Sequence, residues 1–312
     1  MNAISSGSVS NQKSTNVRTK ARSSSPPFVL RALRSSLGVI SRVTPDGAAM
    51  IAERVFLSPR RYVRPAFEHE LCEQARHVFV PSDDGAIATW EWGDEGPRVL
   101  LVHGWEGRGA QLGALVPPLV GLGFRVVTFD APGHGDTAGS ISSLFHFARA
   151  IRSVVRAFGT FHAVVTHSMG GAATTLALSQ EPFARRIAMI APPIDLRDFT
   201  RHLSQQLGLD ENVRARIHRR LGDRFGVPIE SVRVAALAPA MRAPLLVIHD
   251  EEDRNVPIAC GELYASTWPG ATLVRTRGLG HQRILRDDAV VRALVRFVVE
   301  GAPRRQIGEN AA

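Results

Sequence analysis

Apolar residues fall mainly into short runs that alternate with stretches of helical spacing. The short runs are rich in β-branched residues, as buried strands are, and they lie at 77–80, 87–92, 99–103, 125–130, 163–166, 187–191, 245–250 and 272–276. Helical patterns lie at about 110–121, 143–158, 169–180, 257–267 and 285–300. The turn residues Ser82-Asp83-Asp84-Gly85 lie between the first two runs, which predicts a hairpin there.

The later strands are separated by helices, and this order predicts the fold class. Strand–helix–strand units use right-handed crossovers, which give a parallel sheet covered by helices on both faces. We therefore expect an α/β fold with a mostly parallel, eight-stranded sheet, formed by residues 71–193 and 241–312.

The alternation lapses between Pro193 and Pro244. Apolar residues recur there at helical spacing, at Leu203, Leu207, Val213, Ile217, Leu221 and Phe225. This pattern predicts two or three short helices at 194–240, inserted as a cap over the strand ends. The insertion also carries many arginines, which we interpret as a solvated outer face rather than a site for anionic substrates.

The first 70 residues precede the sheet. Residues 1–27 are rich in Ser, Asn and Thr, a composition typical of disorder. We interpret them as a basic solvated tail rather than an organellar transit peptide, and they lack the apolar stretch of a secretory signal. Residues 28–70 form an N-terminal helical arm, expected to pack on the main domain, in which Thr44-Pro45-Asp46 marks a helix start.

Charge and composition exclude several functions. The net charge is +9, but residues 1–45 contribute seven basic residues and no acidic one, so the remaining chain carries only about +2. No nucleic-acid motif accompanies this charge, and no nucleic acid partner is expected. No apolar stretch reaches the length of a membrane span. Cys72 and Cys260 have no disulfide-framework or zinc-site spacing, which fits a cytoplasmic protein without a metal. The oligomeric state is not indicated.

The run 163–166 leads directly to Ser168, which is followed by the helical pattern from Met169 onward. A serine at a sharp strand-to-helix turn adopts strained backbone geometry and exposes its hydroxyl, and the next amide points to where an oxyanion would form. Small residues two positions away on either side let strand and helix approach. Gly170 supplies one of these, whereas Thr166 replaces the other.

An activated serine needs a base and a group that orients the base. His281 follows the last strand in a glycine-flanked loop and is the histidine whose placement fits, whereas His167 adjoins the serine and projects away from it. Four successive carboxylates, at 250–253, lie at the end of the run 245–250 and in the loop that follows it. Asp253 is favoured because it precedes Pro257 by four residues, so that the turn can aim it at His281, and Asp250 is the alternative.

An oxyanion also needs two donors. One would be the amide of Met169, and the other the amide of Trp105, in the loop that follows the run 99–103. The loop 130–135, with glycines at 133 and 135, would support the site without taking part in the chemistry.

Together these residues resemble the α/β-hydrolase superfamily from about His77 to Val299. The chain order Ser168, Asp253, His281 is the order of that superfamily's triad. The resemblance implies a serine hydrolase with a helical cap that acts, without a cofactor, on a small-molecule acyl compound such as a carboxylic ester. A thioesterase, acyltransferase, carbon–carbon bond hydrolase or perhydrolase would use the same residues, and a catalytically silent binding protein would share the fold.

Overall fold

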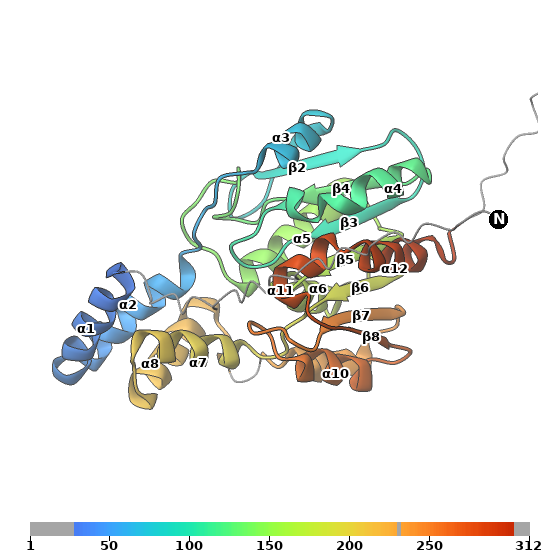
Figure 1. Ribbon diagram of the computed structural model, residues 1–312. Coiled ribbons are helices and arrows are strands. Elements are labelled where there is room, and N and C mark those ends of the chain that lie inside the picture. Colours follow the sequence, from blue (N-terminus) through green and yellow to red (C-terminus); the bar gives the residue numbers. More distant parts are fainter. Residues whose placement is uncertain (1–27, 230–231, 303–312) are drawn as a thin grey trace, which may run out of the picture.

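The computed structural model describes residues 28–229 and 232–302, so the predicted tail at 1–27 lies outside the described residues. One sheet has the strand order β1-β2-β4-β3-β5-β6-β7-β8 (Figure 1). Its strands are β1 (Arg76–Val80), β2 (Ile87–Trp92), β3 (Arg98–Val102), β4 (Arg125–Phe129), β5 (Ala163–His167), β6 (Ile187–Ile190), β7 (Leu245–Asp250) and β8 (Thr272–Thr276). The β1–β2 and β2–β4 pairs are antiparallel and the other pairs parallel, which confirms the predicted fold class.

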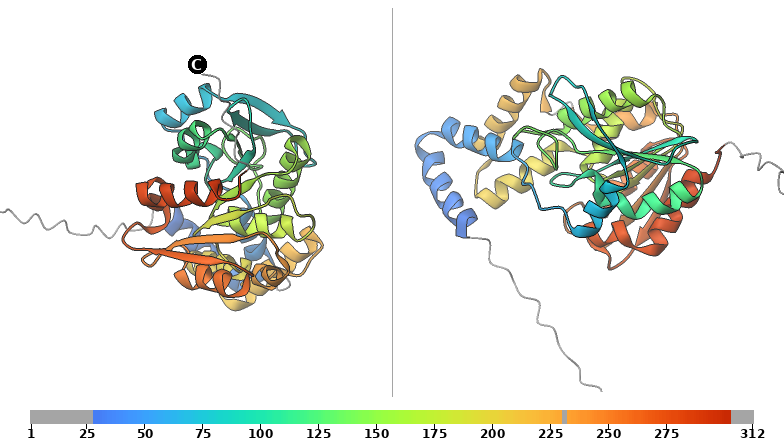
Figure 2. Two further views of the ribbon diagram at one scale, coloured as in Figure 1. Left: turned by 90° about the vertical axis from the view of Figure 1, so that its right-hand side faces the viewer. Right: turned by 90° about the horizontal axis from the view of Figure 1, so that it is seen from above.

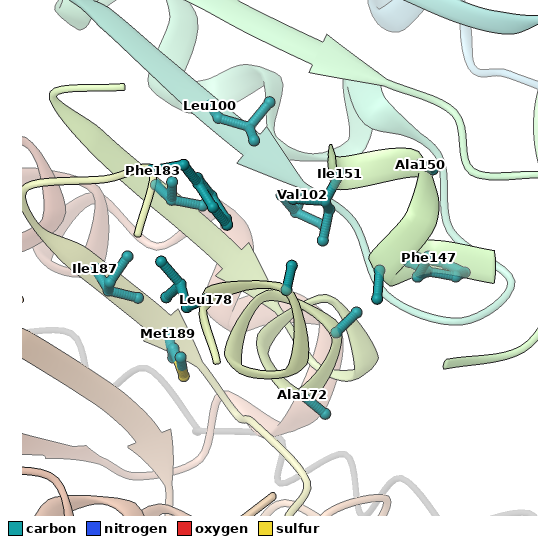
Figure 3. Close-up of a cluster of buried hydrophobic side chains, with 14 of the residues drawn as sticks. Leu100, Val102, Phe147, Ala150, Ile151, Ala172, Leu178, Phe183, Ile187 and Met189 are labelled. Carbon is teal, nitrogen blue, oxygen red and sulfur yellow. The ribbon is translucent and has the colours of Figure 1, made fainter. Parts of the chain in front are cut away.

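Helices cover both faces of the sheet. One face packs against α5 (Leu144–Phe158), α6 (Met169–Leu178) and α10 (Ile258–Thr267). The opposite face packs against η1 (Gly109–Leu115), α4 (Val116–Gly121) and α12 (Asp288–Val299). Figure 3 shows the first of these interfaces, where Leu100 and Val102 of β3 lie near Ile151 of α5. The central strands are buried on both faces because each contributes alternate side chains to the two clusters.

Two predicted helices are divided in the structure. The segment expected at 110–121 is a 3-10 turn followed by α4, which begins with Pro117 and Pro118 near its start. The segment expected at 285–300 is η4 (Ile284–Arg286) followed by α12. Asp287 begins the second helix, because its carboxylate accepts hydrogen bonds from the amides of Ala289 and Val290.

The first helices, α1 (Phe28–Val43) and α2 (Pro45–Leu57), lie against α7 (Leu196–Leu207) and α8 (Glu211–Phe225) (Figures 1 and 2). The expectation that the arm packs on the main domain is therefore wrong for the apolar stripes of α1 and α2, whereas the end of the arm does contact that domain, through the ion pairs of Arg64 and Glu68. The helical apolar stripe of α8 is the reason, because it faces α2 and not the sheet. The two sides share one buried cluster that contains Leu37, Ala48, Ala52, Phe56, Leu207, Val213, Ile217 and Leu221.

Ion pairs also connect the N-terminal arm to α8. Glu53 of α2 is 3% exposed, and its carboxylate accepts hydrogen bonds from Arg220 Nε at 2.5 Å and Arg224 Nε at 2.7 Å. Two shorter helices complete these regions, α3 (Ala66–Glu73) after the arm and α9 (Val234–Leu237) after α8. Within the described residues, no helix has both the length and the apolar character needed to cross a membrane.

Candidate active site

Ser168 lies at the junction between β5 and α6, as the sequence predicts. Its backbone is strained, with φ 51° and ψ −126°. A non-glycine residue in this region costs free energy, and such strain is concentrated at functional sites. The amide of Ser168 donates a hydrogen bond to the carbonyl of Ile190 at 2.9 Å, which attaches the turn to β6.

Gly170 and Gly171 allow the start of α6 to lie close to the sheet. A Cβ atom on Gly170 would lie 2.6 Å from the carbonyl oxygen of His103, a contact that real structures do not tolerate. A Cβ atom on Gly171 would lie 3.2 Å from Oγ1 of Thr166. Thr166 therefore fits at this turn, because the helix opposite it has no side chain at Gly171.

His281 and Asp253 form a hydrogen-bonded pair. Nδ1 of His281 lies 2.7 Å from Oδ2 of Asp253, and the two side chains are 9% and 0% exposed. The other carboxylate oxygen accepts hydrogen bonds from the amides of Asn255 and Val256, at 2.8 and 3.0 Å. Burial alone would raise the pKa of Asp253, but the hydrogen bond and charge of His281 together with these amides lower it. Asp253 is thus held as a carboxylate against the imidazole.

Asp250, the alternative acid, has different partners. Its carboxylate accepts hydrogen bonds from the hydroxyl of Thr276 at 2.8 Å and from the amides of Leu279 and Glu252 at 3.0 Å. Burial would raise the pKa of Asp250, and the amides of Gly280 and Leu279 are the main groups that lower it. Asp250 therefore holds the loop that carries His281, whereas Asp253 contacts the ring.

His281 also lies against the residue that precedes the serine. The rings of His167 and His281 have centroids 4.6 Å apart, and Nε2 of His167 lies 3.0 Å from the carbonyl oxygen of His281. The histidine that follows β8 is thereby brought to the end of β5. Sequence reasoning set His167 aside because its side chain points away from Ser168. The overlooked signal was that this direction leads to the neighbouring strand-end loop.

The predicted oxyanion donors flank the same turn. Met169 begins α6, so its amide has no acceptor within the helix. The loop that carries Trp105 lies on the serine, because a Cβ atom on Gly104 would be 2.9 Å from Cβ of Ser168. Glu106 follows with φ 56°, which turns the chain sharply after Trp105.

Two further histidines, absent from the predicted site, hold this loop against the loop 130–135. Nε2 of His103 accepts a hydrogen bond from the amide of Ala131, at 3.0 Å. Nε2 of His134 accepts one from the amide of Glu106, also at 3.0 Å. Burial lowers the pKa of His103 to about 4 and that of His134 to about 3. Both rings are neutral at physiological pH, as an accepting nitrogen requires.

Aromatic contacts connect the loop that carries Trp105 to the inserted helices. The indole of Trp105 meets Phe199 of α7 edge-on, with centroids 6.0 Å apart, and His134 at 5.3 Å. These ring contacts join the loop that carries Trp105 to the 194–240 segment. Among the described residues, no three His, Cys, Asp or Glu side chains gather in a group that could hold a metal ion.

Comparisons with known proteins bear on the fold and the family of this chain. The profile of the alpha/beta hydrolase family matches residues 99–294. Similar solved structures include the esterase Pf2001 from Pyrococcus furiosus, with TM-score 0.59 and 18% identity over 78% of this chain and 98% of that chain. Est1E from Butyrivibrio proteoclasticus has TM-score 0.58 and 18% identity over 72% and 98% of the two chains.

A bromoperoxidase from Bacillus anthracis is also similar, with TM-score 0.54 and 16% identity over 72% of this chain and 99% of that chain. At these identities the similar structures show the fold alone. No curated protein matches the sequence. The profile, however, covers well over half of the chain and includes the serine turn and the histidine loop. This chain therefore belongs to the alpha/beta hydrolase family.

Proposed function

We propose that this protein is a serine hydrolase that cleaves a carboxylic ester or a related acyl compound through an acyl-enzyme. One observation carries the proposal: the buried Asp253–His281 pair lies beside the strained turn that presents Ser168. A carboxylate, an imidazole and a serine in this relation are the parts of a nucleophilic triad.

In the proposed reaction the hydroxyl oxygen of Ser168 attacks the acyl carbon while His281 takes the hydroxyl proton. Asp253 fixes the tautomer by accepting from Nδ1 of His281, so that Nε2 receives the proton, and its negative charge stabilises the imidazolium. His281 then returns the proton to the leaving alcohol. Water, activated by the same histidine, attacks the acyl-enzyme and releases the acid. No cofactor takes part.

The amides of Met169 and Trp105 would hold the negative oxygen of the tetrahedral intermediates. Backbone donors suit this role because they cost no reorganisation during the reaction, and removing one such donor typically costs about 10²- to 10³-fold in rate. The neutral rings of His103 and His134 support this arrangement, since they fix the loop on either side of Trp105 through the hydrogen bonds given above.

We infer that the 194–240 segment acts as the cap that selects the substrate. Phe199 of α7 reaches the indole of Trp105, so an acyl group beside the proposed oxyanion site would meet apolar surface from both. The packing of α1 and α2 on α7 and α8 makes the N-terminal arm a support for this cap. The expected substrates are therefore small molecules with an apolar acyl group.

The test is Ser168→Ala, measured by hydrolysis of p-nitrophenyl acyl esters and by covalent labelling with a fluorophosphonate. We expect labelling to disappear and kcat to fall about 10⁴-fold or more. Ser179→Ala is the matched control, because Ser179 lies exposed at the other end of α6 and should leave both readouts unchanged. Full labelling of Ser168→Ala would refute the proposal.

The substrate class is identified by assaying Ser168→Ala and Ser179→Ala for hydrolysis of esters, thioesters and diketones and for formation of peracids. A preference for one of the latter three would keep the triad chemistry and change the named reaction. A wild-type protein that resists the fluorophosphonate, under conditions that label a control hydrolase, would instead identify a binding protein on a hydrolase fold.

A further inference from the structure

We propose that His167 is a positioning residue for His281: its Nε2–H donates a hydrogen bond to the backbone carbonyl of His281 and so holds the base at the serine turn. The inference rests on the proposed function for its catalytic consequence. Its structural basis is the 3.0 Å contact between residues 114 positions apart, together with the ring contact at 4.6 Å.

The partner atom fixes the tautomer of His167. A carbonyl oxygen only accepts hydrogen bonds, so Nε2 must carry the proton and Nδ1 is the bare nitrogen. Nδ1 is buried and has no hydrogen-bond partner within the described ranges 28–229 and 232–302. An unsatisfied buried acceptor costs free energy that an apolar side chain of similar size would avoid. The contribution of this imidazole that offsets the cost is therefore the hydrogen bond from its Nε2 donor.

The ring also stays uncharged beside the base. Burial is the main cause that lowers the pKa of His167 to about 3, and the charge of His281 lowers it further. Other groups whose charge reaches this ring are Asp253, which raises its pKa, and His103, which lowers it. A neutral neighbour does not oppose the imidazolium that His281 becomes during the reaction, whereas a lysine or arginine here would.

The loop that carries His281 needs such support. Gly278 and Gly280 have φ values of 80° and 63°, and neither has a neighbouring atom within 4 Å of a Cβ position. Asp250 holds the loop before the base, through the amide of Leu279, and Asp253 holds the ring. His167 supplies the third contact, at the carbonyl of His281 itself. With its backbone carbonyl and Nδ1 held, His281 keeps Nε2 as the ring nitrogen that the proposed reaction uses.

The matched variants are His167→Gln, whose side-chain amide can donate from a place near Nε2, and His167→Met, which has similar length and no donor. His162→Met is the control. His162 is also buried, and its Nε2 also contacts a backbone carbonyl, that of Val298, at 2.7 Å. It lies directly before β5, however, whereas His167 is the last residue of that strand.

We expect His167→Met to lower kcat about 10- to 100-fold with little change in KM, because a displacement of about 1 Å at a catalytic group costs rates of this order. The pH dependence of kcat/KM should also shift in this variant on its acid side, which reports the ionisation of the base. His167→Gln should recover most of the loss. His162→Met should lower the melting temperature as much as His167→Met does, with kcat unchanged. Equal kcat in His167→Met and wild type would overturn the inference.

A second measurement decides the question even if the protein hydrolyses nothing or the methionine variant does not fold. In ¹⁵N-histidine NMR spectra of the folded wild type, His167 should be a neutral Nε2–H tautomer at pH 7 and at pH 6, where a solvated imidazole is mostly charged. The Nδ1 proton that His281 shares with Asp253 should appear in wild type and His167→Gln and be lost in His167→Met. A protonated or Nδ1–H His167 in the wild type would refute the proposal, as would an unaltered His281 proton in a folded methionine variant.

Discussion

Mild acid should unfold this protein, because three neutral histidines are buried around the serine turn. His103, His134 and His167 are 0%, 1% and 2% exposed. Their burial lowers the pKa values from 6.5 to about 4, 3 and 3. The unfolded chain takes up these protons near pH 6.5, whereas the folded chain does not, so stability is complete above that pH and falls as the pH drops toward the folded values.

The expected loss follows from these pKa values. At pH 5 each ring reduces the free energy of unfolding by about 2 kcal/mol, and the three together by about 6 kcal/mol. This amount is comparable with the total stability of a typical domain, about 5–15 kcal/mol. His146 and His249 also have lowered pKa values, chiefly through burial, and act in the same direction.

The assay is urea unfolding followed by circular dichroism at pH 7, 6 and 5. The free energy of unfolding should fall by about 4 kcal/mol per pH unit near pH 5, and His167→Gln should reduce this slope by about 1.4 kcal/mol per unit, the value for one proton. His69→Gln is the control, since His69 is exposed. Equal unfolding midpoints at pH 7 and pH 5 would refute the reasoning, because they would require charged or solvated rings in the folded protein.

Two substitutions test the geometry of the site. Gly170→Ala should lower stability by about 1–3 kcal/mol and also reduce kcat, since its methyl group would lie 2.6 Å from the His103 carbonyl and displace the start of α6. Thermal melts should show no such loss for Gly121→Ala, where a Cβ meets nothing within 4 Å. Asp253→Asn should lower kcat about 10³- to 10⁴-fold, whereas Glu252→Gln, which changes an exposed carboxylate paired with Arg277, should change kcat less than about twofold in the same ester assay. Similar kcat values for the two variants would exclude Asp253 as the orienting acid.

Local pattern was sufficient to predict the sheet. Short apolar runs such as 99–103 and 163–166, separated by helical patterns, are typical of buried strands, and the crossover rule then makes them parallel. The pattern was less informative about helix boundaries. Asp287 divides a continuous helical periodicity because a single side chain there caps two amides, and periodicity does not report such a cap.

The same rule explains why the candidate site could be assembled from the sequence. Carboxyl ends of parallel strands meet at one edge of a sheet, so Ser168, the 250–253 carboxylates and His281 were expected together from their positions in the chain. The structure brings Asp253 and His281 into contact and places the ring of His281 next to His167.

The sequence by itself determined the fold class, the turn that presents Ser168 and the loops that flank it, because these depend on residues close together in the chain. Three features depend on contacts between distant segments and were decided only by the tertiary structure. These are the contact between His281 and Asp253, which the sequence favoured but left open against Asp250, the placement of the arm on α7 and α8, and the hydrogen bond from His167 to His281. Each is a matter of side-chain direction across a folded interface, and periodicity along the chain carries no information about that direction.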